Sequence, residues 1–455
     1  MNVAEVREEF PALQRRPGRS PPVYLDSACM SLVPRSVLAA MEEYYAEYPG
    51  CAGRSLHRFS ELVGRRFEEA RGAFARFLGR SDPRGVVFVR NATEALNVVG
   101  QGLPWQRGDR VVISDREHNS NLVLWQRLAA ERGIRIEVLP LADDGTWDGD
   151  ELDRHLLPGT RLVSLFHTSN LDGRTLPVRE IAERAHDKKA LLLVDGCQAA
   201  PHRSVDADRL GVDFYAVSAH KILGPTGTGV LAGTPAAMES LRPLLIGGET
   251  VNWSTLTEHE LRPPPHRFEA GLQNYAGVIG ARAGIEYLQR VGFEAVDAQQ
   301  LAVNRTATEG LADLDRVHLL GPADPRERSS IFAFTVDGVD PNDVAVFLDE
   351  GHGVMVRSGM HCVHSFYKAR GLVGNARASF YFYNTREDAE TLVAGVRELV
   401  ERVPLSGTSG GTTAGTPRRA SAPRRAAGSR AAAARSAPPR RRAAPGRAAS
   451  GAGSG

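Results

Sequence analysis

Seven largely apolar segments alternate with segments of helical length between residues 86 and 233, and this alternation constrains the fold more than any other feature. The segments are Val86–Val89, Arg110–Ile113, Ile134–Leu139, Arg161–Phe166, Ala190–Asp195, Val212–Val217 and Gly229–Gly233. Apolar strands separated by helices are typical of a mostly parallel sheet that is covered on both faces. The sequence therefore predicts an α/β fold built on a mostly parallel, seven-stranded sheet.

Polar residues follow these segments where the predicted strands end. They are Thr93, His118, Asn170, Asp195, Gln198, Ser218, His220 and Lys221. In an open α/β sheet the carboxyl ends of the strands form the edge at which ligands bind. We therefore expect these side chains to meet in one binding site.

Lys221 is unusual because lysine is scarce in this chain, which has only four lysines among its 56 basic residues. Arginine is always protonated, whereas a lysine amine can lose its proton and attack a carbonyl. Free lysine has a pKa of about 10.4, so a reactive amine needs a special site. The alternative is a lysine that ends a strand and reaches solvent.

A strand-end lysine beside an aspartate and small hydroxyls suits pyridoxal 5′-phosphate (PLP), which binds lysine as a Schiff base and stabilises a carbanion. Asp195 follows an apolar run, where a buried carboxylate would keep the ring nitrogen protonated; a helix cap or a sugar-hydroxyl acceptor is the alternative. The candidate phosphate donors are Thr93, Ser218 and His220. His118 is either a ring that stacks on the cofactor or a structural histidine.

The chain divides into four predicted regions. Residues 1–20 form an N-terminal arm, 21–290 a large PLP-binding domain and 291–403 a smaller α+β domain. Residues 404–455 contain ten arginines and no acid, and their Ala/Arg/Pro/Ser/Gly composition predicts a disordered tail. A nucleic-acid-binding tail is the alternative, but it has no aromatic residue for base stacking.

Composition limits the class of protein. The whole chain carries a net charge of +2, so without the ten tail arginines the body carries −8, which gives no case for a nucleic-acid-binding domain. No apolar run is long enough to span a bilayer. The four cysteines, Cys29, Cys51, Cys197 and Cys362, show no CxxC pairing. A disulfide scaffold or a zinc ribbon is therefore not expected, no metal is predicted, and the expected compartment is the cytoplasm.

The motifs around these residues resemble a known family. Val194-Asp-Gly-Cys-Gln198 and Ser218-Ala-His-Lys-Ile-Leu-Gly-Pro-Thr-Gly227 are similar to the class V aminotransferase superfamily of PLP fold type I. Arg357-Ser-Gly-Met-His-Cys362, Arg267-Phe-Glu-Ala-Gly271 and Arg377-Ala-Ser-Phe-Tyr-Phe-Tyr-Asn-Thr385 resemble the SufS/Csd-like group II cysteine desulfurases. The resemblance covers about residues 20–402. It implies a homodimeric, PLP-dependent enzyme that converts L-cysteine to L-alanine.

The resemblance also implies a role for each site residue. Lys221 would form the Schiff base and shuttle a proton, with His118 stacked on the ring. Asp195 would hold the ring nitrogen and Gln198 the phenolic oxygen, while Thr93, Ser218 and His220 bind phosphate. Asn170 and Arg377 would hold the substrate carboxylate. Cys362 would accept the sulfur as a persulfide and pass it to an acceptor protein, for iron–sulfur cluster assembly or another sulfur-transfer pathway.

Other chemistry remains open at this stage. Ala92 stands before Thr93 where many members have a second threonine, and Leu272-Gln273 follow Gly271 where many have Thr-Pro. A selenocysteine lyase, a C–S lyase or an amino-acid epimerase of the same superfamily would need Lys221 but not Cys362. For Cys362 itself, we expect His361 and Arg357 to lower the thiol pKa if they face it.

Overall fold

The computed structural model describes residues 1–14, 22–53 and 55–403. The predicted tail and residues 15–20 of the predicted N-terminal arm lie outside the described residues. Within the described part of the chain, no helix is long and apolar enough to cross a membrane. The arm contains α1 (Val3–Glu8) and a 3₁₀ turn, η1 (Pro11–Leu13).

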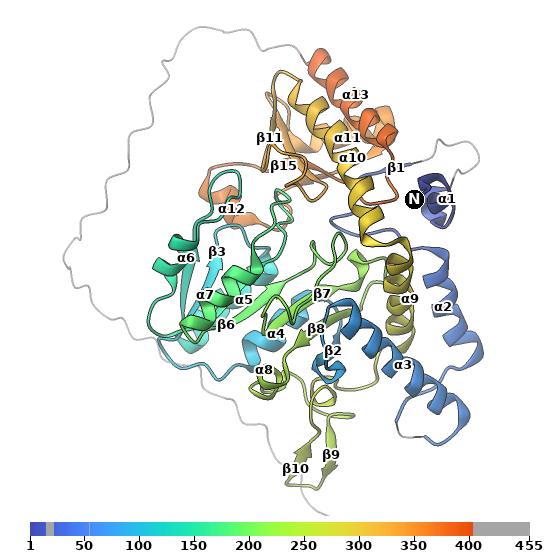
Figure 1. The fold of residues 1–455 in the computed structure, drawn as a ribbon, viewed down its shortest axis with the longest axis vertical. Helices are drawn as coiled ribbons and strands as arrows, with labels where there is room; N and C mark the ends of the chain where they lie inside the picture. Colours follow the sequence, from blue (N-terminus) through green and yellow to red (C-terminus); the bar gives the residue numbers. More distant parts are fainter. Residues whose placement is uncertain (15–21, 54, 404–455) are drawn as a thin grey trace, which may run out of the picture. The chain divides into compact units, whose positions relative to one another are not determined.

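A seven-stranded sheet forms the centre of the molecule (Figure 1). In chain order its strands are β2 (Val86–Val89), β3 (Arg110–Ser114), β4 (Arg135–Leu139), β5 (Thr160–Phe166), β6 (Leu191–Asp195), β7 (Phe214–Ser218) and β8 (Gly229–Gly233). They lie side by side in the order β2-β8-β7-β6-β5-β3-β4, and only β8 runs antiparallel to its neighbours. The prediction of a mostly parallel seven-stranded sheet is confirmed.

Helices cover both faces of this sheet. In chain order they are α2 (Arg35–Glu47), α3 (Arg58–Phe77), α4 (Ala92–Gly102), α5 (Val123–Arg132), α6 (Gly149–His155), α7 (Val178–Asp187), α8 (Pro235–Glu239) and α9 (Tyr275–Val291). One apolar core joins the sheet to α3, α7 and α9, and a second joins it to α4, α5 and α8. Successive strand residues alternate between the cores: Val194 faces the first and Leu193 the second. Both faces are therefore buried, as the continuous apolar runs predict.

The C-terminal region builds a smaller antiparallel sheet. Its strands are β11 (Val317–Leu319), β12 (Ile331–Val336), β14 (Arg357–Gly359) and β15 (Asn375–Ser379), in the order β11-β12-β15-β14. The helices of this region are α10 (Phe293–Ala312), α11 (Pro341–His352), α12 (His364–Ala369) and α13 (Arg386–Arg402). This is the predicted smaller α+β part of the chain.

The N-terminal strand joins this smaller part. β1 (Val23–Tyr24) pairs in parallel with β13 (Val354–Met355), and Leu25 packs into the core of the small sheet. The predicted boundaries put this strand in the large domain, yet Met1–Ser406 forms one compact unit. The division at residue 290 therefore stays a prediction. The pairing carries residues 26–29 back toward the edge of the large sheet.

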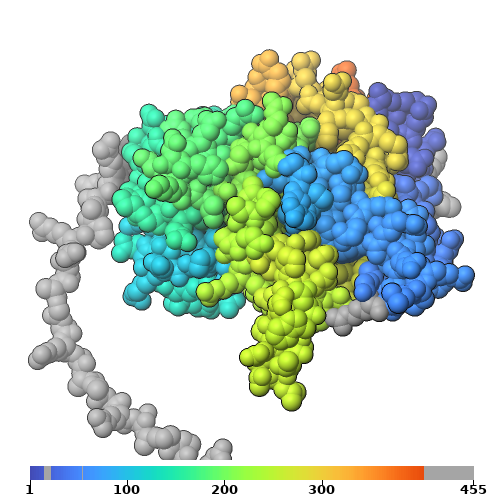
Figure 2. Space-filling view, turned by 60° about the horizontal axis from the view of Figure 1, so that its bottom comes forward, coloured from blue at the N-terminus to red at the C-terminus, as the bar shows by residue number. Residues whose placement is uncertain are grey.

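A β-hairpin projects from the part of the molecule that contains the large sheet (Figure 2). The sequence did not predict it. It consists of β9 (Val251–Ser254) and β10 (His259–Leu261). Its residues are mostly exposed, so the strands lack the apolar pattern that identifies a buried strand.

Candidate active site

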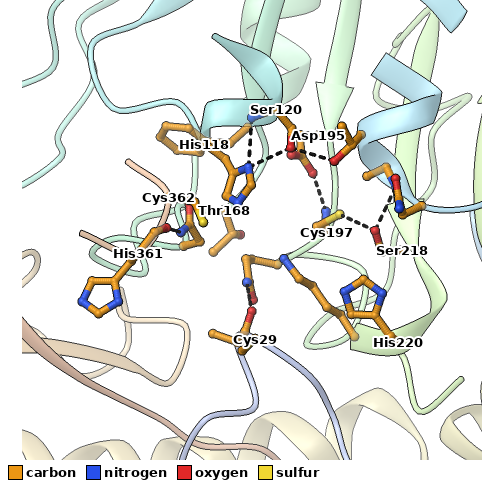
Figure 3. Close-up of a pocket in the computed structure, with 18 of the residues that line it drawn as sticks. Cys29, His118, Ser120, Thr168, Asp195, Cys197, Ser218, His220, His361 and Cys362 are labelled. Carbon is orange, nitrogen blue, oxygen red and sulfur yellow. Dashed lines mark hydrogen bonds between the residues drawn. The ribbon is translucent and has the colours of Figure 1, made fainter. Parts of the chain in front are cut away.

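All ten residues predicted for the site line one pocket of about 240 Å³. They are Thr93, His118, Asn170, Asp195, Gln198, Ser218, His220, Lys221, Cys362 and Arg377. The floor of the pocket consists of the carboxyl ends of β5, β6 and β7 and the start of α4. Loops from the N-terminal segment and from the C-terminal region complete it (Figure 3). The structure therefore brings together every residue that the sequence singled out.

Lys221 ends a 3₁₀ turn, η4 (Ala219–Lys221), that follows β7 directly. Ser31 fixes this turn from the N-terminal segment: its backbone N–H donates to the His220 carbonyl at 2.9 Å, and its Oγ accepts from Leu223 N at 2.8 Å. Gly224 is required because a Cβ there would lie 2.9 Å from the Ala219 carbonyl oxygen. The amine is therefore held by a rigid turn at the edge of the sheet.

Asp195 is the last residue of β6 and is 9% exposed. Its Oδ1 accepts the Cys197 N–H at 3.0 Å. Gly196 leaves room for the Tyr215 ring, because a Cβ there would lie 2.0 Å from it. Gln198 donates its Nε2 to the Ala28 carbonyl at 2.7 Å, which ties the strand end to the N-terminal segment.

The start of α4 forms the anion-binding side of the pocket. Asn91 caps the helix, and Gly229 lets β8 approach it, since a Cβ there would lie 2.7 Å from the Asn91 Cα. Ser218 Oγ accepts the Ala92 N–H at 2.9 Å, and Thr93 Oγ1 lies 2.7 Å from Ser120 Oγ. A helix N-terminus with adjacent hydroxyls is a suitable site for a phosphate group.

His118 lies in the turn after β3 and faces the pocket (Figure 3). Its Nδ1 accepts the Ser120 N–H at 3.1 Å, which orients the ring. Burial, and then the positive charge of Lys221, lower the His118 pKa to about 4. Burial and Lys221 likewise lower the His220 pKa to about 4. Both rings are therefore neutral at pH 7.

Arg377 is a buried cation at the opposite side of the pocket, on β15. Its Nη1 donates to the Asn170 backbone carbonyl at 2.9 Å, and its Nη2 lies 3.4 Å from the Asp26 carboxylate. Its Nε is buried and has no hydrogen-bond partner. An arginine held in this way suits a substrate carboxylate. The Asn170 side chain donates to the His361 carbonyl at 2.8 Å, so it also supports the loop that carries Cys362.

Cys362 lies in a tight loop after β14. His361 and Cys362 have φ angles of +46° and +60°, a left-handed conformation that costs a residue with a Cβ on the order of 1–3 kcal/mol. Asn119 N donates to the Cys362 carbonyl at 2.6 Å, and this contact helps to hold the strained loop against the turn after β3. The thiol is half-buried at the pocket wall (Figure 3).

The sequence made activation of Cys362 depend on whether His361 and Arg357 face its thiol, and His361 does not meet this condition. His361 is turned away: its Nε2 lies 2.6 Å from Asn375 Oδ1, and burial lowers its pKa to about 3, so it carries no charge at pH 7. The Arg357 guanidinium contacts a different thiol, Cys29, with Nη1 2.7 Å from Sγ. Sequence proximity does not fix side-chain direction in such an irregular loop.

Seven polar residues besides these ten also line the pocket. They are Cys29, Asn91, Ser120, Thr168, Cys197, Arg357 and His361. Cys29 reaches the pocket through the pairing of β1 with β13, so no local pattern could have identified it. Ser120 follows His118 by two positions, so the sequence already indicated that it lies at the same strand end.

These residues together fit PLP. A lysine amine, a buried carboxylate, neutral imidazoles and hydroxyls at a helix N-terminus line one pocket, which matches the aldehyde, ring nitrogen, ring and phosphate of the cofactor. The unpartnered Arg377 Nε adds a donor for a carboxylate beside it. Among the described residues, no group of His, Cys, Asp and Glu has an arrangement that could hold a metal ion.

Comparison with known proteins agrees with this geometry. The aminotransferase class-V family model matches residues 23–392. A probable cysteine desulfurase of Halalkalibacterium halodurans is 37% identical over 404 residues, which cover 88% of this chain and 98% of that protein. The apo structure of cysteine desulfurase from Thermococcus onnurineus NA1 has a TM-score of 0.84 at 37% identity, covering 88% of this chain and 98% of the other.

A more distant structure carries the cofactor. It is a lysine-to-alanine mutant of C-DES with glycine covalently linked to PLP. It is 25% identical with a TM-score of 0.74, and the match covers 86% of this chain and 99% of the other.

Proposed function

Because this chain belongs to the aminotransferase class-V family, we propose that it is a PLP-dependent cysteine desulfurase that releases L-alanine from L-cysteine and takes the sulfur on Cys362. The observation that carries the proposal is the meeting of Lys221 and Cys362 in one pocket, although they follow strands of two different sheets. A lysine site alone serves many reactions of amino acids, whereas a thiol opposite it provides an acceptor for sulfur.

In this proposal each side of the pocket has a defined task. PLP, when bound, supplies a sink for the negative charge that forms at the substrate Cα. Lys221 holds the cofactor and moves a proton at Cα, and Asp195 keeps the ring nitrogen protonated. Gln198 would hold the phenolic oxygen, and Thr93, Ser218, His220 and the start of α4 would hold the phosphate. His118 would stack on the ring as a neutral group.

Arg377 and Asn170 orient the substrate carboxylate, which directs the substrate sulfur toward Cys362. The Cys362 thiolate attacks this sulfur, a new S–S bond forms, and the C–S electron pair remains on the carbon that becomes the alanine methyl group. The product on the enzyme is a persulfide, and a sulfur-acceptor protein removes it. Iron–sulfur cluster assembly in the cytoplasm is the pathway that we propose for this sulfur.

The test is amino-acid turnover by the purified holoenzyme. We expect stoichiometric L-alanine from L-cysteine, and a Cys362→Ala variant should lose at least about 100-fold in the presence of a thiol acceptor, because the nucleophile is gone. Cys51→Ala is the matched control, since Cys51 does not line the pocket. Unchanged alanine release from Cys362→Ala would favour a C–S lyase, and preferred turnover of selenocysteine or racemisation would favour the corresponding alternatives.

We also propose that the chain is a homodimer. Six large apolar side chains lie exposed on the hairpin of β9 and β10 and on the segments before and after it. They are Leu244, Leu245, Ile246, Trp253, Leu256 and Leu272. Exposed apolar side chains gathered in this way are typical of an interface. Light scattering should give twice the chain mass, and Leu245→Glu should shift it toward the monomer.

A further inference from the structure

Three of the four cysteines line the same pocket: Cys29, Cys197 and Cys362. The proposed function uses only Cys362. The other two differ in their surroundings, and the difference decides which of them can take part in sulfur chemistry. A thiolate reacts, whereas a thiol does not.

Cys197 lies behind the strand end and is unreactive. It is buried, and burial, followed by the nearby Asp195 carboxylate, raises its pKa to about 12. Its Sγ lies 3.6 Å from Ser218 Oγ. Low dielectric surroundings and a neighbouring negative charge both oppose ionisation of this thiol.

Cys29 has the opposite surroundings. It is half-buried, and the Arg357 guanidinium donates to its sulfur at 2.7 Å. A guanidinium that donates to a sulfur holds that sulfur in position and keeps a positive charge beside it. The Arg377 cation also interacts with Cys29, and the Asp26 carboxylate that opposes them is itself held by Arg377 at 3.4 Å. Two cations and one acid therefore surround this sulfur.

The position of Arg357 links the two reactive thiols. Arg357 begins β14, and the loop that follows this strand carries Cys362. The same strand that positions the Cys362 loop therefore holds Cys29 through its arginine. Both sulfurs line the pocket of about 240 Å³, Cys362 beside His361 and Cys29 on the N-terminal segment (Figure 3).

We propose that Cys29 is a second sulfur-carrying thiol, which takes the terminal sulfur from the Cys362 persulfide. This inference rests on the proposed function, because it needs a persulfide on Cys362. The Cys29 thiolate attacks the outer sulfur, and a new S–S bond forms on Cys29. The S–S bond to Cys362 breaks, and its electron pair leaves with Cys362 as a thiolate. Nothing is oxidised or reduced overall, and no further reactant is needed. Cys362 is thereby freed to accept sulfur from the next substrate.

The experiment locates the sulfur by mass rather than by activity. Holoenzyme is mixed with L-cysteine, quenched with iodoacetamide at increasing times and digested, and each cysteine peptide is examined for an added sulfur atom. We expect the added sulfur first on Cys362 and then on Cys29, with none on Cys51 or Cys197. In Cys29→Ser it should remain on Cys362 alone, and in Cys362→Ser neither peptide should carry it.

A variant of the arginine tests the reason for the transfer. Arg357→Gln should lower the sulfur on Cys29 relative to Cys362 by about tenfold, because Cys29 loses the charged donor that holds its sulfur. Cys51→Ser is the matched control and should leave the distribution unchanged.

Each outcome has a distinct meaning. Sulfur on Cys362 with none on Cys29 in the unmodified enzyme would overturn the transfer and leave the proposed function intact. Sulfur on Cys29 in Cys362→Ser would also overturn it, since Cys29 would then attack the substrate directly. Absence of sulfur from both peptides, with no alanine formed, would instead show that the proposed function is wrong.

Discussion

Two halves of one pocket differ in how the chain holds them. The lysine half, which includes Asp195, Ser218 and Lys221, lies on the ends of neighbouring strands of the large sheet. The thiol half, which includes Cys29 and Cys362, lies on loops that meet through contacts between distant parts of the sequence. The positions of the lysine half are therefore fixed by the order of strands in the large sheet. The positions of the thiol half are fixed by contacts between the large-sheet region and the small-sheet region. Groups that must not move can be built on strands, whereas groups that must reach a second protein are better placed on loops.

Removal of Lys221 should have the largest effect, because the lysine half then lacks its one reactive amine. Lys221→Ala should lower alanine release by on the order of 10²- to 10⁴-fold, the loss expected for general acid–base catalysis alone. Borohydride reduction of the unmodified holoenzyme should attach the cofactor covalently to the Lys221 peptide, which mass spectrometry can identify. Lys188→Ala is the control, since Lys188 is exposed at the end of α7 and does not line the pocket. Full activity of Lys221→Ala would contradict the assignment.

Arg377 lies where the two halves meet, and its replacement should act on substrate binding. Arg377→Lys should raise the KM for L-cysteine by about 10- to 100-fold with a smaller change in kcat, since a hydrogen bond to a charged group contributes about 1.5–3 kcal/mol. Steady-state kinetics provide the measurement, and Arg386→Lys, on the exposed start of α13, provides the control. A loss in kcat with an unchanged KM would show that Arg377 does not hold the ground-state carboxylate.

The same difference explains what the sequence could predict. Continuous apolar runs followed by polar residues predicted the strands and the ligand-binding edge, because each strand and its end are adjacent in sequence. The partner of Arg357 could not be predicted: its guanidinium contacts Cys29, which lies 328 positions earlier, although Cys362 is close in sequence. The hairpin of β9 and β10 was missed because its strands are exposed and lack apolar periodicity.

Acid should weaken both halves, because each includes histidines whose pKa is lowered by burial, and in the thiol half this histidine is His361. Burial lowers the His361 pKa to about 3, below that of an unfolded histidine near 6.5. The unfolded chain therefore binds more protons in this window, and stability is lost as pH falls from about 6.5 toward 3. Between pH 7 and pH 5, His361 should cost about 2 kcal/mol of unfolding free energy.

Urea unfolding at the two pH values tests this expectation. His361→Gln should lose about 2 kcal/mol less on acidification than the unmodified protein, because glutamine does not titrate. His318→Gln is the matched control, since His318 is exposed on β11. Equal losses in His361→Gln and in the unmodified protein would show that the ring is not kept neutral by burial.

The smallest effect should come from one hydroxyl of the lysine half. Thr93→Ala should weaken PLP binding by only about fivefold, near the 1 kcal/mol of one neutral hydrogen bond, because Ser218, His220 and the start of α4 remain. The Thr93 hydroxyl is also shared with Ser120, 2.7 Å away, so part of its hydrogen bonding is directed within the protein. Titration of cofactor-free protein with PLP, followed by fluorescence, gives the affinity, and Thr391→Ala on α13, outside the pocket, gives the control. A hundredfold loss would mean that Thr93 is the main phosphate ligand. It would contradict the geometry of the pocket, which indicates that the other strand-end groups of this half share the phosphate.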